Sequence, residues 1–258
     1  MQTNKIWKLA LPALLFVLPA AAQKTVSSAQ IIRKINQGEA VEISNAVIQG
    51  ALDLTELDNK APETGKGNSS EAYKSKVNVP LVFRNCSFEG DVIAYKVLKT
   101  NGKRKKLLEW DSDSQVLYTA DFSRRVIFEG CTFRGLSEFK YSGFSGEVSF
   151  SGADFSAPAN FKYAHFSDRA DFSEAAFGDG ADFKYAQFQE EANFSSARMM
   201  DDASFKYAGF RKNVDFQHTS FQGFADFKYT SFKQATDFHE TSFRKGSDFK
   251  YTSGDYRL

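Results

Sequence analysis

Large apolar side chains recur between residues 138 and 252 at steps that alternate between five and six residues. One cycle consists of Phe161, Phe166, Phe172 and Phe177, and the triplet Phe-Lys-Tyr returns every 22 residues. A small residue, most often Ala, stands two positions before most of these apolar residues. A helix would rotate such positions around its axis, because its period is 3.6 residues. A fixed period near 20 residues instead indicates a solenoid of stacked repeats.

Each unit of the pattern predicts a short extended segment followed by a corner. Because side chains alternate along a strand, the small residue and the Phe face one side and the residue between them faces the other. Four such segments in 22 residues predict an all-β, four-sided parallel β-helix, whose coils stack through main-chain hydrogen bonds about 4.8 Å apart. The 27 Phe of the chain then fill the inside of the coils.

The repeat units resemble those of the pentapeptide-repeat family. The segments 170–174 (Ala-Asp-Phe-Ser-Glu) and 225–229 (Ala-Asp-Phe-Lys-Tyr) match its A-(D/N)-(L/F)-x-x pattern. The resemblance implies a right-handed four-sided β-helix, and it implies little about function. The chain departs from the family pattern by a regular sixth residue in every second unit, which gives coils of 22 residues instead of 20.

Residues 1–22 are expected to be a signal peptide. They combine a basic start, an apolar run from Leu9 to Leu18 and three Ala before Gln23. We therefore expect an exported chain, periplasmic or extracellular, with no membrane span after cleavage, because no later stretch is long and apolar enough. Loss of this segment leaves 31 basic and 32 acidic residues, a balance that predicts no nucleic-acid partner.

The next segment, residues 23–42, is predicted to cap the first coil with a short helix. Ser28 is the expected N-cap of a helix over Ser27–Gln37, Ile31 and Ile35 belong to its apolar face, and Gly38 ends it. The β-helix is then expected over residues 43–253, and residues 254–258 form a short tail.

Two insertions interrupt the predicted β-helix. Residues 55–76 are polar and are interpreted as a loop that leaves one corner. Residues 95–116 predict a hairpin with a turn at Asn101-Gly102 and a return strand over residues 105–110. A basic run lies at or just after its tip and is a candidate binding site: Lys103, Arg104, Lys105 and Lys106.

The repeats also predict a ladder of side chains along one outer edge. It consists of Lys140, Lys162, Lys184, Lys206, Lys228 and Lys250 with Tyr141, Tyr163, Tyr185, Tyr207, Tyr229 and Tyr251. We call this set the Lys–Tyr ladder. It is flanked by Glu138, Asn160, Asp182, Ser204, Asp226 and Asp248. Two interpretations stay open: the ladder stabilises its corner by acid–Lys pairing and Tyr stacking, or it binds a glycan, a cell-wall polymer or a protein.

Candidate catalytic chemistry is sparse in the sequence. We find no glycine-rich phosphate loop and no nucleophile elbow, and a coil filled with Phe has no room for a substrate. His218 and His239, with Asp215, Asp237 and Glu240, fall on one face but lack a predicted pocket, so we expect no metal site. Cys86 and Cys131 occupy the Ala slot and are expected to be small buried side chains, and whether they pair is left open. No cofactor and no enzymatic activity are predicted.

The function expected from these features is a non-enzymatic exported scaffold or binding module of the cell envelope. Two alternatives are a partner-binding adhesin or immunity-type protein and, by resemblance, a DNA mimic that acts on DNA gyrase. The second needs a strongly acidic cytoplasmic rod, whereas residues 139–253 hold 16 acidic and 13 basic side chains. At the C-terminal coil, Thr and Ser replace Ala in the inward slot, which predicts either an end sealed by hydroxyl groups or a homodimer through that coil.

Overall fold

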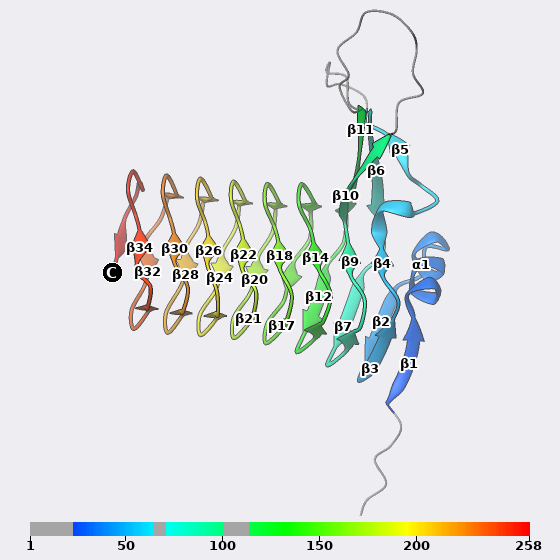
Figure 1. Ribbon diagram of the computed structural model, residues 1–258, viewed down its shortest axis with the longest axis horizontal. Helices are drawn as coiled ribbons and strands as arrows, with labels where there is room; N and C mark the ends of the chain where they lie inside the picture. Colours follow the sequence, from blue (N-terminus) through cyan, green and yellow to red (C-terminus); the bar gives the residue numbers. More distant parts are fainter. Residues whose placement is uncertain (1–22, 64–70, 101–113) are drawn as a thin grey trace, which may run out of the picture.

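A rod of stacked coils with four walls forms the body of the molecule in the computed structural model (Figure 1), which describes residues 23–63, 71–100 and 114–258. Each wall is a sheet of mostly parallel strands, and we call the four walls sheets A to D. This confirms the predicted four-sided parallel β-helix. The expected signal peptide and the run Lys103–Lys106 lie outside the described residues.

Sheets A and B form two of the walls. Sheet A contains β1 (Lys24–Ser27), β3 (Ala46–Gln49), β8 (Ser87–Phe88), β13 (Thr132–Phe133), β17 (Asp154–Phe155), β21 (Ala176–Phe177), β25 (Arg198–Met199), β29 (Ser220–Phe221) and β33 (Ser242–Phe243). Sheet B contains β2 (Val41–Ser44), β7 (Leu81–Arg84), β12 (Val126–Glu129), β16 (Val148–Ser149), β20 (Ala170–Asp171), β24 (Ala192–Asn193), β28 (Val214–Asp215), β32 (Thr236–Asp237) and β35 (Tyr256–Arg257).

Sheets C and D form the other two walls. Sheet C contains β4 (Leu52–Asp53), β9 (Val92–Ile93), β14 (Ser137–Glu138), β18 (Ala159–Asn160), β22 (Ala181–Asp182), β26 (Ala203–Ser204), β30 (Ala225–Asp226) and β34 (Ser247–Asp248). Sheet D contains β5 (Ala61–Pro62), β6 (Glu71–Val77), β10 (Tyr95–Thr100), β11 (Ser114–Phe122), β15 (Gly143–Phe144), β19 (His165–Phe166), β23 (Gln187–Phe188), β27 (Gly209–Phe210) and β31 (Ser231–Phe232).

The core consists of aromatic columns that run along the rod. Phe183 lies between Phe161 and Phe205, with ring centroids 5.0 Å away on each side and interplanar angles of 3° and 2°. Rings of a second column, Phe172 and Phe194, meet it edge to face at 5.2 and 5.3 Å. Parallel register forces this stacking, because each coil places the same residue type directly over the last. The small residue two positions before each core Phe is buried with it as far as Phe238, as predicted, and in the last coil both positions are more exposed.

Each five-residue corner is a turn whose third residue has a positive φ. In the turn Phe161–Ala164, the Ala164 amide donates to the Phe161 carbonyl at 3.0 Å, and Tyr163 has φ +60°. The Asp or Asn of the repeat closes the same corner: the amide of Lys184 donates to Asp182 Oδ1 at 2.9 Å. The short side chain of Asp or Asn is suited to accept a bond from the amide two residues later in the chain. This explains why the second position of the repeat motif is Asp or Asn.

The N-terminal end of the rod is covered by α1 (Ser28–Asn36), as predicted. The N-cap is Ser27, not the expected Ser28, because Ser27 and Gln30 form a reciprocal capping box. Gly38, at φ +73°, ends the helix with a bond from its amide to the Ile35 carbonyl. Ile31 and Ile35 are buried against the first coil. No helix of the described residues is long and apolar enough to cross a membrane.

The first insertion is not simply the loop expected over residues 55–76. It begins with a 3-10 turn, η1 (Leu54–Glu56), and returns as β6, which pairs in parallel with β11 over seven residues. Ser75 and Val77 are buried, and the Ser75 hydroxyl donates to the Thr55 carbonyl at 2.9 Å. The polar composition of the insertion concealed a strand that depends on a partner distant in sequence.

The second insertion contains an antiparallel pair of strands. β10 pairs with β11 in the register Tyr95↔Thr119 to Thr100↔Ser114, so the strand that returns beside β10 belongs to Ser114–Phe122. The predicted turn at Asn101-Gly102 and the predicted return strand over residues 105–110 lie outside the described residues.

The C-terminal end also differs from the expectation. Residues 256–257 are not a tail but β35, which pairs with β32, and Tyr256 stacks on Phe249 with ring centroids 5.4 Å apart. The Thr hydroxyls do not seal this end. Instead they donate backwards to Phe carbonyls of the preceding coil: Thr219 to Phe194, Thr230 to Phe205, Thr241 to Phe216 and Thr252 to Phe227.

These backward bonds predict a small, measurable contribution to stability. Thr230→Ala removes a 2.8 Å bond to Phe205 O but leaves that carbonyl its bond from the Ala208 amide. Ala fits the slot, because Ala208 and Ala186 fill it in earlier coils. We expect the free energy of unfolding in urea to fall by about 0.5–1.5 kcal/mol. An unchanged value would show that the hydroxyl bond contributes nothing net.

Candidate binding surface

The Lys–Tyr ladder and both insertions occupy the same corner of the rod, between sheets C and D. The register Val92↔Ser137 and Phe122↔Phe144 places the second insertion where every later coil has Phe-Lys-Tyr. The first insertion leaves the coil after β4, and the chain rejoins the coil in β6, at the equivalent corner. We call the extension formed by β5, β6, β10 and β11 the flap. It rises from the rod next to the coils that carry the ladder (Figure 1).

The six Tyr of the ladder form one continuous stack. Neighbouring ring centroids are 4.7–4.8 Å apart and the planes are within 18° of parallel. Tyr95, the first residue of β10, extends the stack towards the flap, with its centroid 5.8 Å from that of Tyr141. All six Tyr of the ladder have φ between +60° and +63°. The positive φ turns each ring away from the coil and into line with its neighbours.

This stacking decides what the Tyr side chains can offer to a partner. Tyr163, Tyr185 and Tyr207 are each 37% exposed, and both faces of each ring are covered by neighbouring rings. What reaches solvent is therefore the ring edge and the hydroxyl, repeated at every coil. Tyr251, the last ring of the stack, contacts a ladder Tyr on one face, Tyr229, and is 60% exposed. A partner along the stack would bind by hydrogen bonds to phenols and not by stacking on them.

The ladder Lys side chains fall into two environments. Lys228 pairs with Asp248 of the next coil at 2.9 Å and Lys184 pairs with Asp182 at 3.7 Å. Lys162 and Lys206 have no acidic partner within 4.0 Å among the described residues, and their Nζ atoms lie 5.4 Å from the rings of Tyr163 and Tyr207. Asn160 and Ser204 stand where other coils have an acid, but Lys140 and Lys250 also have no acidic partner within 4.0 Å among the described residues, although Glu138 and Asp248 flank them.

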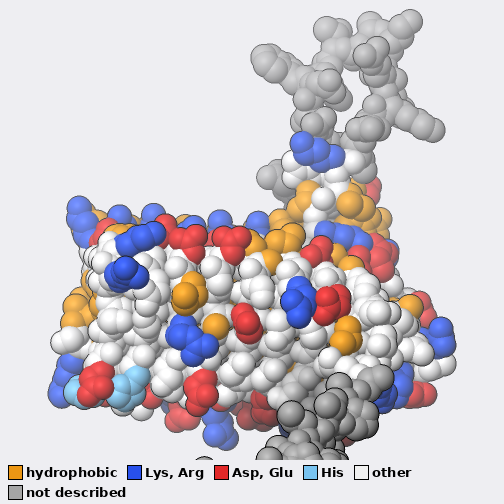
Figure 2. All heavy atoms as spheres, turned by 60° about the horizontal axis from the view of Figure 1, so that its bottom comes forward, with side chains coloured by type: hydrophobic (Ala, Val, Ile, Leu, Met, Phe, Trp, Pro, Cys, Tyr) orange, Lys and Arg blue, Asp and Glu red, His pale blue; other side chains and the backbone are white. Residues whose placement is uncertain are grey.

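The pKa values along this corner follow the pairing. The hydrogen bond with Asp248 raises the pKa of Lys228, and the same bond lowers the pKa of Asp248. Burial alone would lower the pKa of Lys140, but its 3.1 Å hydrogen bond to the Tyr95 hydroxyl, together with charge interactions with Tyr95, Tyr141 and Glu138, outweighs this and raises it. Burial raises the pKa of Glu138. Lys140 and Lys228 therefore keep their charge at neutral pH. Figure 2 shows basic and acidic side chains along the upper edge of the rod, beside the flap.

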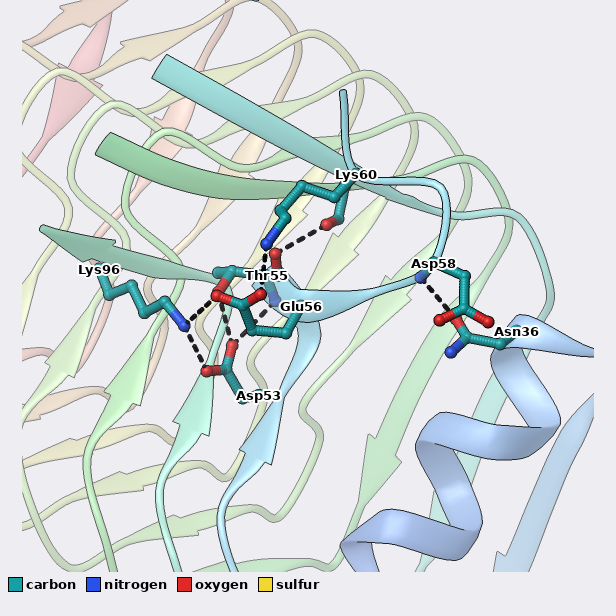
Figure 3. Close-up of polar contacts among 8 residues, drawn as sticks. Asn36, Asp53, Thr55, Glu56, Asp58, Lys60 and Lys96 are labelled. Carbon is teal, nitrogen blue, oxygen red and sulfur yellow. Dashed lines mark hydrogen bonds and ion pairs between the residues drawn. The ribbon is translucent and has the colours of Figure 1, made fainter. Parts of the chain in front are cut away.

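Ion pairs at the root of the flap hold it against the rod (Figure 3). Lys96 of β10 lies 2.8 Å from Asp53 Oδ2 and 2.7 Å from Glu56 Oε1, and Lys60 also binds Glu56. Hydrogen bonds from these two Lys lower the pKa of Glu56. The ammonium groups of Lys60 and Lys96 lie 5.2 and 5.3 Å, respectively, from the ring centroid of Tyr118.

Two more contacts fix the first insertion in place. Asn36, at the end of α1, accepts a hydrogen bond from the Asp58 amide at 3.1 Å. The side chain of Asn59 bonds both main-chain groups of Lys76, at 2.7 and 3.0 Å, as a neighbouring strand would. The sequence analysis missed this cluster, because its members come from two insertions whose pairing no local pattern reveals. Tyr95 was a signal in the sequence that the second insertion starts at the ladder corner. It directly follows the core position Ala94, just as Lys140 of the ladder directly follows the core position Phe139.

Grooves accompany the ladder on sheet C and occur elsewhere on the rod. A groove of about 460 Å³ on sheet C is lined by Asp182, Lys184, Ser204 and Asp226. A larger one, about 710 Å³, lies on sheet B near the C-terminus and is lined by Asp215, Asp237, His239 and Arg257. Both are open channels along a wall, not enclosed pockets, as expected for a rod whose interior is filled.

The two His weighed as metal ligands lie at the corner between sheets B and A. His218 Nδ1 is 3.0 Å and His239 Nε2 is 3.3 Å from the carboxylate of Glu240. Asp215 and Asp237 instead accept main-chain bonds from Gln217 and His239. Within residues 23–63, 71–100 and 114–258, no three potential ligands come close enough to hold a metal ion.

Comparison with known proteins identifies the repeat. Residues 117–165 and 161–209 match the family of pentapeptide repeats (9 copies). Neither the curated proteins nor the solved structures give a match to the chain. The matched residues supply the central coils, whose strands stack in parallel in all four sheets. Residues 117–209, which form the central coils of the four-sided parallel β-helix, are therefore a run of pentapeptide repeats.

Proposed function

We propose that this protein is a non-enzymatic, exported scaffold of the cell envelope that binds an extended partner along the Lys–Tyr ladder and the root of the flap. The partner is a protein or an envelope polymer such as a glycan or a cell-wall strand. The family supports a repeat scaffold or binding protein in general. Export rests on the expected signal peptide.

One observation carries this proposal: the ladder and both insertions share a single corner. The walls of a β-helix need neither a projecting sheet nor an identical outward pair in every coil for their stability. Here Tyr95 and Lys140 join the two features, with Lys140 Nζ 3.1 Å from the Tyr95 hydroxyl and 4.6 Å from its ring centroid. A partner that follows the rod would meet phenol hydroxyls and ammonium groups at every coil and the flap at one end.

The charge of this corner favours a partner with acceptor groups over a cationic one. Lys162 and Lys206 keep ammonium groups without an acidic partner among the described side chains. Phenol hydroxyls beside them can donate to carboxylate, hydroxyl or carbonyl oxygens. A surface that imitates DNA would present carboxylates there instead.

The experiment compares two corners of the same rod. In the test variant, the six ladder Tyr are replaced by Ser, which the coil tolerates at positive φ because Ser196 has φ +57° at the opposite corner. In the matched control, Glu174, His218 and Glu240 of that opposite corner become Ser. Immobilised proteins are exposed to envelope extract, and soluble proteins are sedimented with purified cell-wall material.

We expect the wild type and the control to capture the same partner and the ladder variant to lose it. Equal capture by all three proteins would remove the ladder from consideration. Loss in both variants would point to a general defect of the rod, which circular dichroism of each protein would reveal.

A further inference from the structure

Cys86 and Cys131 lie in the same slot of two successive coils. Their following residues are paired, Ser87 with Thr132, and the Thr132 amide donates to the Cys86 carbonyl at 2.8 Å. Both side chains are buried, at 2% and 0% exposure. Later coils fill this slot with Ala153, Ala175 and Ala197. The insertion between the two Cys hid this neighbourhood in the sequence.

The two thiols lie in the same slot of successive coils, and each donates to main-chain carbonyls, Cys86 to Ile43 and Arg84 and Cys131 to Glu129. The interaction between the two side chains lowers the pKa of the Cys86 thiol and raises that of Cys131, so Cys86 is the group that more readily becomes a thiolate. Adjacent strands of a sheet lie about 4.7–4.9 Å apart, and disulfides join residues whose Cα atoms are about 4.4–6.8 Å apart. Side chains at the same position of paired strands also point the same way. The Cα spacing therefore fits a disulfide, whereas Cβ atoms that point the same way lie about as far apart as the strands and disulfides need Cβ atoms about 3.5–4.5 Å apart. Forming the bond requires side-chain rotation and a small approach of the two Cβ atoms.

We propose that Cys86 and Cys131 form a disulfide between successive coils when the chain folds in the presence of a disulfide oxidant. The thiolate of Cys86 attacks one sulfur of a small disulfide such as glutathione disulfide, forms a mixed disulfide and releases one thiolate. Cys131 then loses its proton and attacks the Cys86 sulfur, which releases the second thiolate. The two protein thiols are oxidised to one disulfide, and the small disulfide is reduced to two thiols.

The position of the Cys86–Cys131 disulfide indicates that it would stabilise the end of the rod that carries the flap. The loop that it closes, residues 86–131, contains β8, β9, β10, β11 and β12, and therefore the whole second insertion. The bond would tie the coil before this insertion to the coil after it, at the end of the rod that carries the flap. Closing a loop of this size restricts the unfolded chain and stabilises the folded one. The expected oxidising compartment agrees with this role, but the chemistry needs only the oxidant.

The test uses the full chain, unfolded in urea and refolded in glutathione buffers of increasing oxidised fraction. We expect the intact mass to fall by two hydrogen atoms, a proteolytic peptide pair joined through Cys86 and Cys131, and a melting temperature about 5–10 °C higher than that of the reduced protein. The control is the double variant Cys86→Ala and Cys131→Ala, which places in both slots the residue that later coils use. Its melting temperature should not depend on the buffer.

Two results would overturn the proposal. One is a refolded chain that keeps both thiols free to alkylation in fully oxidised buffer. The other is oxidation to mixed disulfides or disulfide-linked dimers without the internal pair. Both outcomes are independent of whether the Lys–Tyr ladder binds a partner.

Discussion

Replacing Phe183 by Ala is expected to lower the free energy of unfolding by about 3–5 kcal/mol. The ring stacks on Phe161 and Phe205 and meets Phe172 and Phe194 edge to face. Its loss opens a cavity that the coils above and below cannot close, because their hydrogen bonds to each other fix the spacing. Urea denaturation followed by circular dichroism measures the change.

A matched control comes from the chain itself. Met199 occupies a core column between Phe177 and Phe221, and it is as fully buried as they are. Phe183→Met should therefore cost less than about 1.5 kcal/mol, because the thioether chain fills most of the volume of the ring. If Phe183→Ala and Phe183→Met were equally stable, the stacked column would not be the main source of stability in this rod.

The regular part of the fold could be predicted from the sequence because every coil repeats the same constraint. The alternation of five- and six-residue steps gave the number of walls, the inward slots and the edge on which the ladder lies. Local chemistry also located α1, although the capping box placed its start at Ser27 and not Ser28. In a repeat, one correct assignment applies to every coil.

The flap could not be predicted, because its strands depend on contacts between distant segments. β6 has its partner in β11, about 45 residues later, and the ion pairs of Lys96 reach back to Asp53 and Glu56. The partner of β10 is Ser114–Phe122, and no local sequence pattern specifies this register. The positive φ of the ladder Tyr was also missed, since Tyr is not a residue that sequence rules assign to such turns.

A graded loss of binding is the second large effect that we expect. Six equivalent coils carry the Lys–Tyr ladder, so a partner that follows the rod would bind it as a multivalent site. Replacing Tyr185 and Tyr207 by Ser interrupts the stack and should weaken binding modestly. Replacing all six Tyr should abolish it, because no contiguous run of phenol hydroxyls remains.

Stability must be measured beside binding, because the stack also contributes to folding. Tyr185 contacts both Tyr163 and Tyr207, at 4.7 Å, and its removal should lower the free energy of unfolding by about 1–2 kcal/mol. If the Lys–Tyr ladder only stabilised the corner of the rod, the melting temperature would fall with each Tyr replacement, and the amount of partner retained would not change. The Phe183→Ala protein, which keeps the outer surface intact, provides the reference for a destabilised rod with an unaltered ladder.

The most direct test of the proposed function is the affinity of the captured partner for the wild type, the two-Tyr variant and the six-Tyr variant, measured by titration at a temperature at which all three are folded. We predict a modest loss for the two-Tyr variant and no measurable binding for the six-Tyr variant. A folded six-Tyr variant that binds the partner as tightly as the wild type would contradict the assignment of the Lys–Tyr ladder as the binding surface.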